Sequence, residues 1–243
     1  MAERTLELIK PVLDRRPCDQ LALAYYVTAL KLMKNPKSEE IANISRLTEL
    51  REIACPEGFS TLREFNQALS ARLLELHSAV QEPLHQSVRG GTQLQLLPIL
   101  RKESIISLLA EQLLSNLKKF VSGLKFEVGH PFLGNIPQDI NFSGLWSVRL
   151  YSGGHHKSHV HPEGWLSSAY YVSLPDAVNS SDEGALQLSQ PPMKSLHDKI
   201  EPHVLRPREG SLALFPSYLW HGTIPFSDAS PRLTVAFDIA HSS

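Results

Sequence analysis

Residues 159–175 read HVHPEGWLSSAYYVSLP, which joins two histidines to a run rich in Trp, Leu, Tyr and Val. Aromatic and β-branched residues of this kind are typical of strands. In an extended strand, residues i and i+2 point to the same side. The pattern therefore predicts extended structure here, and it places His159 and His161 where both can bind one metal ion.

Further short β-rich runs surround this stretch, and turn residues such as Gly153-Gly154 and Pro191-Pro192 separate them. Many short strands at close spacing, without helices between them, are typical of a sandwich or jelly roll. The second half of the sequence therefore predicts strands at residues 145–151, 165–174, 185–188, 203–205, 211–215, 222–225 and 233–239.

Before about residue 140, apolar residues recur at three- and four-residue spacing, which indicates helices. We expect helices over residues 61–77 and 104–120, and a polar loop over residues 87–93 (SVRGGTQ) between them. Amphipathic helices of this kind can cover one face of a sheet. The predicted fold class is α+β, a double-stranded β-helix (jelly roll) core with N-terminal helices packed on one face.

Residues 1–50 have the apolar spacing of two helices joined near Arg15-Arg16-Pro17. The pair is compatible with two ordinary packing helices or with the remnant of one tetratricopeptide-like repeat. A single repeat cannot bury its own apolar face, so in the second case the pair would be a fragment or a capping element.

The overall composition is that of an ordinary globular protein. The chain has 243 residues, 42% of them hydrophobic and 20% charged, with a formal net charge of -1. No charge excess favours nucleic acid or an anionic membrane, and no apolar run is long enough to span a bilayer. Two cysteines, Cys18 and Cys55, are too few for a disulfide framework. With no secretory signal, these features predict a cytoplasmic protein.

A third histidine and a downstream arginine extend the candidate site. His221 stands at the start of a predicted strand and can supply a third imidazole from a distant part of the chain. Imidazole suits iron and zinc, and three ligands on one face leave the opposite positions open. Arg232 lies in the last predicted strand, beside the apolar residues of 233–237. A buried guanidinium needs an anion, either an acidic small molecule or a salt bridge to Asp238 or another acidic residue.

The pattern His159-Val160-His161 … His221 … Arg232 resembles the His-x-Asp/Glu … His … Arg signature of the Fe(II)/2-oxoglutarate oxygenases. More narrowly, the chain resembles the prolyl-hydroxylase-like oxygenases of this type that often follow tetratricopeptide repeats. The resemblance implies an oxygenase domain over residues 51–243, with helical support over 51–140 and a β-helix core over 141–243. The segments that carry it are LHQSVRGGTQ (84–93), SGLWSVRL (143–150), HVHPEGWLSSAYYVSLP (159–175), GSLALFPSYLWH (210–221) and RLTVAFDI (232–239).

The resemblance implies a role for each matching residue. His159 and His221 match the two histidines of the iron-binding triad. Arg232 matches the residue that pairs with the distal carboxylate of 2-oxoglutarate. Tyr171 stands where related hydroxylases direct a tyrosine hydroxyl at that carboxylate, although a strand aromatic can equally be a core residue.

Position 161 departs from the usual carboxylate of the triad. A three-histidine site carries one negative charge fewer, but it can still bind iron through His161. Glu163 is the alternative carboxylate, and it is disfavoured because Pro162 bends the chain and residue i+4 of a strand reaches a shared site poorly. His155 and His156 are expected beside the site or in a loop rather than among the ligands.

The resemblance thus implies an enzyme, an Fe(II)- and 2-oxoglutarate-dependent dioxygenase. It would use dioxygen to hydroxylate an unidentified peptidyl or small-molecule substrate, releasing succinate and CO2. The residues also leave open a three-histidine metal protein of cupin type: a 2-oxoglutarate-independent dioxygenase, a zinc hydrolase or an inactive binding module. Arg232 argues against the first two of these, because neither needs it.

Overall fold

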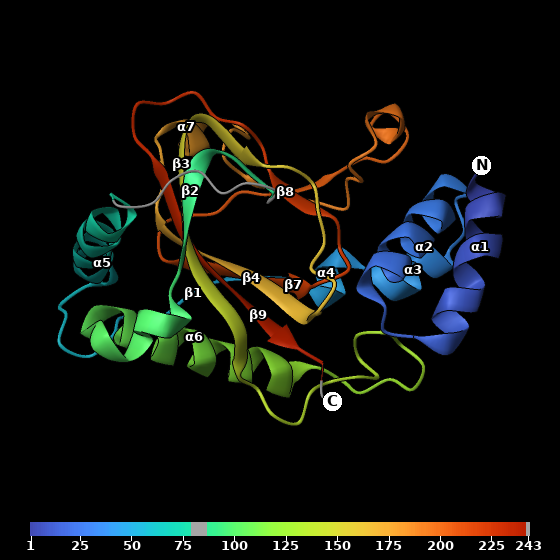
Figure 1. Ribbon diagram of the computed structural model, residues 1–243, viewed down its shortest axis with the longest axis horizontal. Coiled ribbons are helices and arrows are strands. Elements are labelled where there is room, and N and C mark those ends of the chain that lie inside the picture. Colours follow the sequence, from blue (N-terminus) through green and yellow to red (C-terminus); the bar gives the residue numbers. More distant parts are fainter. Residues whose placement is uncertain (79–86, 242–243) are drawn as a thin grey trace.

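Two antiparallel β-sheets form the core of the protein in the computed structural model, which describes residues 1–78 and 87–241 (Figure 1). The larger sheet has six strands in the order β1-β7-β4-β9-β3-β2, and the smaller has three in the order β6-β5-β8. This arrangement confirms the predicted α+β fold with a double-stranded β-helix core. The strands are β1 (Glu49–Glu52), β2 (Val88–Gln95), β3 (Phe142–His156), β4 (Gly164–Ser173), β5 (Leu186–Leu188), β6 (His203–Leu205), β7 (Ser211–Pro216), β8 (His221–Thr223) and β9 (Arg232–Ala240).

Strand β9 separates the hydrophobic core from a polar interior. Side chains alternate between the two faces of a strand. On one face, Arg232, Thr234 and Ala236 line a cavity between the two sheets. On the other face, alternate residues join the main hydrophobic cluster beneath the helices, and these are Leu233, Val235, Phe237 and Ile239.

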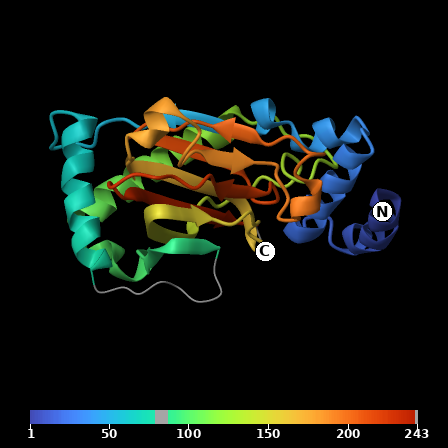
Figure 2. The same ribbon diagram turned by 90° about the horizontal axis from the view of Figure 1, so that it is seen from above.

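Helices α5 (Leu62–His77) and α6 (Ser104–Gly123) cover the outer face of the larger sheet (Figures 1 and 2). Both confirm the helices that apolar spacing predicts. Helix α5 begins after Thr61, whose hydroxyl accepts a hydrogen bond from the amide of Glu64, as an N-cap does. Helix α6 buries an apolar stripe in the same cluster as the sheet, through Ile106, Leu109, Leu113, Leu117 and Phe120.

Strand β2 shows that the loop predicted over residues 87–93 is wrong. From Val88 on, this segment is a strand that pairs antiparallel with β3. Two glycines hide the strand pattern, and the register shifts between Arg89 and Gly91. Gly91 is needed for close approach, because a Cβ there would lie 2.3 Å from the carbonyl oxygen of Arg149. Strand β1, which the sequence pattern does not predict, forms the opposite edge of the sheet.

A helical hairpin precedes the sheets, as the spacing within residues 1–50 predicts. Its second helix packs against the segment that leads into β8. The Trp220 indole donates a hydrogen bond of 3.0 Å to the Thr28 hydroxyl, and Tyr25 meets the same indole edge-on at 5.4 Å. A repeat origin for the hairpin stays a prediction. The helices of this region are α1 (Ala2–Arg15), α2 (Gln20–Leu32), α3 (Lys37–Ala42) and α4 (Ile44–Leu47).

Short helical turns complete the secondary structure, at η1 (Leu97–Lys102), α7 (Ala177–Ser180) and η2 (Lys194–Leu196). Within residues 1–78 and 87–241, no helix combines the length and the apolar character that crossing a membrane requires.

His77, the last residue of α5, is buried between that helix and the larger sheet. Its Nδ1 lies 2.8 Å from the Thr92 hydroxyl of β2, and its Nε2 lies 2.9 Å from the Ser147 hydroxyl of β3. Burial and the nearby Arg149 guanidinium lower the pKa of His77 to about 4. The imidazole is therefore neutral at pH 7, and it joins the helix to two strands.

We expect His77 to make the metal-free protein less stable in mild acid. The unfolded chain binds a proton at the ordinary histidine pKa of about 6.5, whereas the folded chain does so only near 4. Stability from this group is therefore complete above about pH 6.5 and declines as the pH falls toward 4. Between about pH 7.5 and about pH 5 the free energy of unfolding should fall by about 2 kcal/mol on this account.

Urea unfolding of the parent protein and His77→Gln at both pH values measures this contribution. The glutamine variant should be less stable at the higher pH, because it cannot reproduce both hydrogen bonds. Its pH dependence should nevertheless be weaker than that of the parent by about the same 2 kcal/mol. An equal pH dependence in the two proteins would show that His77 does not titrate as described.

Candidate metal centre

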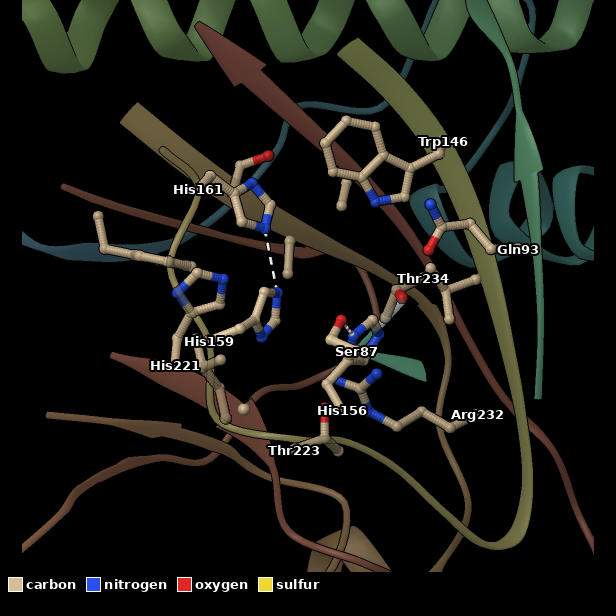
Figure 3. A pocket seen from close by; sticks show the side chains of 17 residues that line it. Ser87, Gln93, Trp146, His156, His159, His161, His221, Thr223, Arg232 and Thr234 are labelled. Atoms are coloured by element: carbon tan, nitrogen blue, oxygen red, sulfur yellow. Dashed lines mark hydrogen bonds between the residues drawn. The ribbon is translucent and has the colours of Figure 1, made fainter. Parts of the chain in front are cut away.

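A cavity of about 250 Å³ lies between the two sheets, and it contains every histidine of the predicted ligand set (Figure 3). The three histidines lie along one side, and Arg232 lies at the opposite end from Trp146. The cavity is lined by Ser87, Gln93, Trp146, Val148, His156, His159, His161, Ser168, Ala169, Leu186, Phe215, His221, Gly222, Thr223, Arg232, Thr234 and Ala236.

Backbone pairing brings the three histidines together. His159 follows strand β3, and His221 begins β8. Each of these residues donates its amide to the carbonyl of the other at 3.0 Å, which extends the smaller sheet by one bridge. His161 lies two residues beyond His159 and turns the same way. One ring nitrogen from each of the three histidines lies within 4.8 Å of the others, a spacing that suits a shared metal ion.

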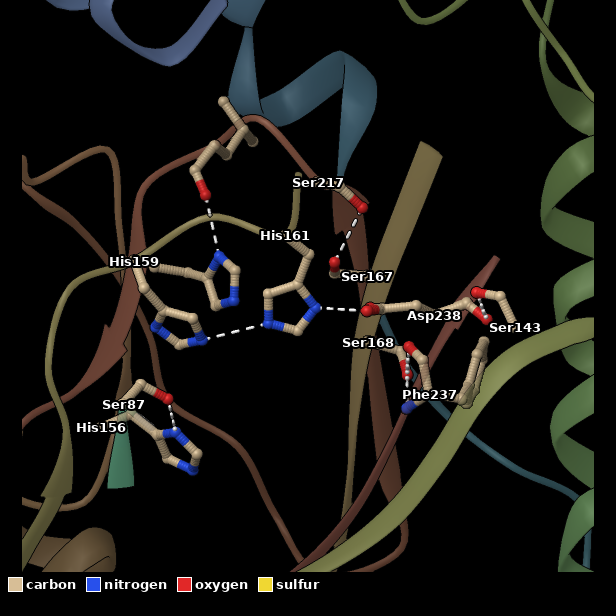
Figure 4. A network of polar contacts seen from close by, with 12 residues as sticks. Ser87, Ser143, His156, His159, His161, Ser167, Ser168, Ser217, Phe237 and Asp238 are labelled. Atoms are coloured by element: carbon tan, nitrogen blue, oxygen red, sulfur yellow. Dashed lines mark hydrogen bonds and ion pairs between the residues drawn. The ribbon is translucent and has the colours of Figure 1, made fainter. Parts of the chain in front are cut away.

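Each of the three rings is held through its Nδ1 atom. His159 Nδ1 lies 2.8 Å from the carbonyl oxygen of Lys157, and His221 Nδ1 lies 2.9 Å from that of Leu219. His161 Nδ1 contacts the Asp238 carboxylate (Figure 4). Because these oxygens only accept hydrogen bonds, each Nδ1 carries a proton. In the neutral rings, the lone pairs on Nε2 are therefore available for a metal.

The protonation of the rings also suits a metal site. Burial is the first cause that lowers the pKa of His159, to about 4, and the neighbouring His161 lowers it further. Burial likewise holds the pKa of His221 well below the usual range. His159 Nε2 and His161 Nε2 lie 3.1 Å apart. Two lone pairs at that distance repel unless a proton or a cation lies between them, so the donor set fits a divalent metal.

Arg232 is buried in the same cavity, with 2% of its surface exposed. Its Nε donates to the Gly184 carbonyl at 3.0 Å, and its guanidinium lies 5.1 Å from the centre of the Tyr171 ring. Among the described residues no carboxylate forms an ion pair with it. The alternative salt bridge to Asp238 is wrong, because that carboxylate contacts His161. Burial lowers the pKa of Arg232, as expected for a cation without a partner anion.

Tyr171 lies beneath the guanidinium rather than in the wall of the cavity. Its ring is fully buried, and burial raises the pKa of its hydroxyl, which the charge of Arg232 opposes. The adjacent Tyr170 points the other way and donates a hydrogen bond of 2.6 Å to Asn66 of α5. Glu163, the alternative carboxylate ligand, is exposed and belongs to neither the three-histidine cluster nor the cavity wall.

Beyond the predicted ligands, the cavity wall contains His156, which was expected from the sequence beside the site or in a loop, and residues that were not named from the sequence. His156 lies in the wall, with its Nδ1 2.9 Å from the Ser87 hydroxyl and its ring 5.7 Å from that of His159. Thr234 could have been found by counting two residues along the strand from Arg232. Gln93 could not, because it belongs to the strand that resembles a loop.

Comparison with known proteins shows which family this part of the chain resembles. Residues 144–238 match the family described as "Putative 2OG-Fe(II) oxygenase". No curated protein sequence matches the chain.

Solved structures share the fold at low sequence identity. A prolyl-4-hydroxylase from Pseudomonas putida is 15% identical, with a TM-score of 0.54 over 83% of this chain and 96% of that one. A prolyl hydroxylase from Trichoplax adhaerens, in complex with a hypoxia-inducible-factor peptide, is 14% identical, with a TM-score of 0.56 over 86% and 92%. HygX from Streptomyces hygroscopicus, solved with nickel and 2-oxoglutarate, is 13% identical, with a TM-score of 0.53 over 82% and 84%.

The matched segment contains His159, His161, His221 and Arg232, and the structural likeness extends over most of the chain. Residues 144–238 therefore resemble the 2-oxoglutarate/Fe(II) oxygenases in sequence, and the chain shares the fold of solved members of that group.

Proposed function

We propose that this protein is an Fe(II)- and 2-oxoglutarate-dependent dioxygenase that hydroxylates an organic substrate. The observation that carries the proposal is the content of one cavity. Three Nε2 atoms converge on one side, and a buried guanidinium without a carboxylate partner in the described chain lies at one end. A metal protein that does not bind 2-oxoglutarate would leave this buried guanidinium without an anion to pair with.

In this proposal His159, His161 and His221 hold Fe(II) through Nε2, and their Nδ1 contacts keep the rings from turning. Once bound, the metal and 2-oxoglutarate together activate dioxygen, so that decarboxylation to succinate and CO2 accompanies oxidation of a C–H bond. Buried apolar side chains such as Leu186 and Phe215 line the cavity beside the histidines and would limit the access of water, which protects reactive species and strengthens the electrostatic contacts.

The opposite end of the cavity suits the distal carboxylate of 2-oxoglutarate. Gly184 engages only Nε of Arg232, which leaves the two terminal nitrogens of the guanidinium to form a bidentate pair with an anion. The Tyr171 ring supports the guanidinium from below. Hydroxyl groups of Thr223 and Thr234 line the same part of the cavity and can donate to the same carboxylate.

We propose residues 51–243 as the oxygenase domain, with residues 1–50 as a helical segment that supports it. The contacts of α2 with Trp220 favour this supporting role.

The test is an anaerobic titration of the metal-free protein with Fe(II) and then 2-oxoglutarate. We expect one Fe(II) per chain and, on addition of 2-oxoglutarate, a metal-to-ligand charge-transfer band in the visible spectrum. Admission of air should then produce succinate slowly even without added substrate. Tight zinc binding, with no band and no succinate when iron is supplied, would favour a hydrolase or a binding module instead.

A further inference from the structure

Asp238 is an acidic residue on the cavity side of β9, close to the metal centre. Its side chain is 14% exposed, and its Oδ2 contacts His161 Nδ1. Its other oxygen, Oδ1, is buried and accepts no hydrogen bond from any described residue. A buried carboxylate with one unsatisfied oxygen is costly, so a compensating positive charge is expected nearby.

The three histidines differ in what holds them. His159 and His221 donate to backbone carbonyls, which are neutral, whereas His161 donates to a carboxylate. A carbonyl would have been enough to fix the ring of His161, as it is for the other two. The carboxylate therefore adds something that orientation alone does not require, namely a negative charge one imidazole away from the metal position.

Among the residues that the structure describes, those lining the cavity carry no negative charge: they include Arg232 and four histidines but no Asp or Glu. A divalent metal bound by three neutral imidazoles would therefore be surrounded by neutral and positive groups. Among the described residues, Asp238 is the carboxylate that contacts a member of the three-histidine cluster, and it stands behind position 161, where the usual oxygenase triad has an acidic ligand.

We propose that Asp238 supplies the missing carboxylate of this site indirectly, by polarising His161 so that its Nε2 becomes a more basic and more negative ligand. The inference rests on the proposed function, because it concerns Fe(II) at the three histidines. Asp238 is a positioning and charge-tuning residue and does not touch the metal. A carboxylate hydrogen-bonded to a ligating histidine raises the basicity of that ligand, and its loss weakens metal binding about 10–100-fold.

The decisive variant is Asp238→Asn, because asparagine keeps an oxygen that can hold His161 Nδ1 but removes the charge. We expect Fe(II) affinity, measured by competition with a chelator, to fall about 10–100-fold. The charge-transfer band with 2-oxoglutarate should move to shorter wavelength, since a more electropositive Fe(II) gives up its electron less readily. Asp238→Ala should shift the band in the same direction and weaken affinity at least as much.

A stability measurement separates charge tuning from a structural role. Near pH 8, the metal-free Asp238→Asn protein should unfold at the same temperature as the parent or a higher one, because the half-satisfied carboxylate is gone. A purely structural Asp238 predicts a lower unfolding temperature and an unshifted band. The matched control is Ser143→Ala, which removes a hydrogen bond of 3.0 Å to the Asp238 main-chain carbonyl and leaves the carboxylate intact. This control should keep the parent affinity and band.

The outcomes distinguish the two proposals. If the parent protein gives a band and Asp238→Asn gives the same band with the same Fe(II) affinity, the role of Asp238 is refuted and the oxygenase proposal stands. If the parent itself binds Fe(II) but gives no band with 2-oxoglutarate, the oxygenase proposal fails. In that case an Asp238→Asn loss of metal affinity still supports the charge-tuning role at the three histidines.

Discussion

Substitution of His159 or His221 by alanine is expected to abolish Fe(II) binding. Each change removes one of three converging imidazoles and leaves two, which hold Fe(II) poorly at a site whose described lining residues include no carboxylate. The loss should exceed the 10–100-fold effect that is typical of residues behind the ligands. Iron content after desalting, together with chelator competition, measures it directly.

The matched control for this experiment is His156→Ala. His156 is a histidine of the same cavity wall, but its Nδ1 is engaged by Ser87, and it is not one of the three clustered residues. It should retain stoichiometric iron. If both His159→Ala and His221→Ala keep one iron per chain with parent affinity, the proposed ligand set is incorrect, and a different group of side chains must bind the metal.

Substitution of Arg232 by alanine should weaken 2-oxoglutarate binding while leaving the iron in place. Charge-assisted hydrogen bonds contribute about 1.5–3 kcal/mol net, which corresponds to about one to two powers of ten in the dissociation constant. Arg232→Lys should restore only part of this affinity, because an ammonium group cannot form the planar pair of hydrogen bonds. The charge-transfer band, followed as 2-oxoglutarate is added, gives the dissociation constant for each variant.

Arg149 provides a close control for Arg232. It lies on the neighbouring strand β3, and its guanidinium also stacks on a tyrosine, at 4.8 Å from the Tyr151 ring. It is absent from the cavity wall, to which β3 contributes Trp146, Val148 and His156 instead. Arg149→Ala should therefore bind 2-oxoglutarate as the parent does. Equal dissociation constants and equal succinate formation in Arg232→Ala and the parent would remove the basis for the cosubstrate pocket.

The helices and strands that could be predicted are those in which the spacing of apolar residues along the sequence matches the face that is buried in the fold. Helix α6 buries one continuous apolar stripe, and β9 alternates between core and cavity, so simple periodicity identifies both. The pairing of His159 with His161 was expected from strand geometry, although the structure places both outside the named strands and gives only His159 a single bridge, to His221. His221 and Arg232 were placed by resemblance and by the apolar context of the last strand.

The parts that were not predictable depend on contacts between distant segments. Strand β2 is polar on both faces because one side meets His77 and the other meets the cavity. Strand β3 continues through Gly153-Gly154 to His156, where glycines suggest a turn. The alternative salt bridge between Arg232 and Asp238 does not form, because the two residues share one face of β9 but lie at opposite ends of it, and Asp238 contacts His161.

The contact between α2 and Trp220 shows whether the helical hairpin can be separated from the β-helix domain. Trp220 immediately precedes His221, and its buried indole N–H has its hydrogen-bond partner on Thr28. Removal of residues 1–50 would leave that donor unsatisfied and expose an aromatic surface directly behind the metal centre. The proposed division between residues 50 and 51 is therefore not an energetic boundary, and the hairpin and the β-helix should unfold as one cooperative unit.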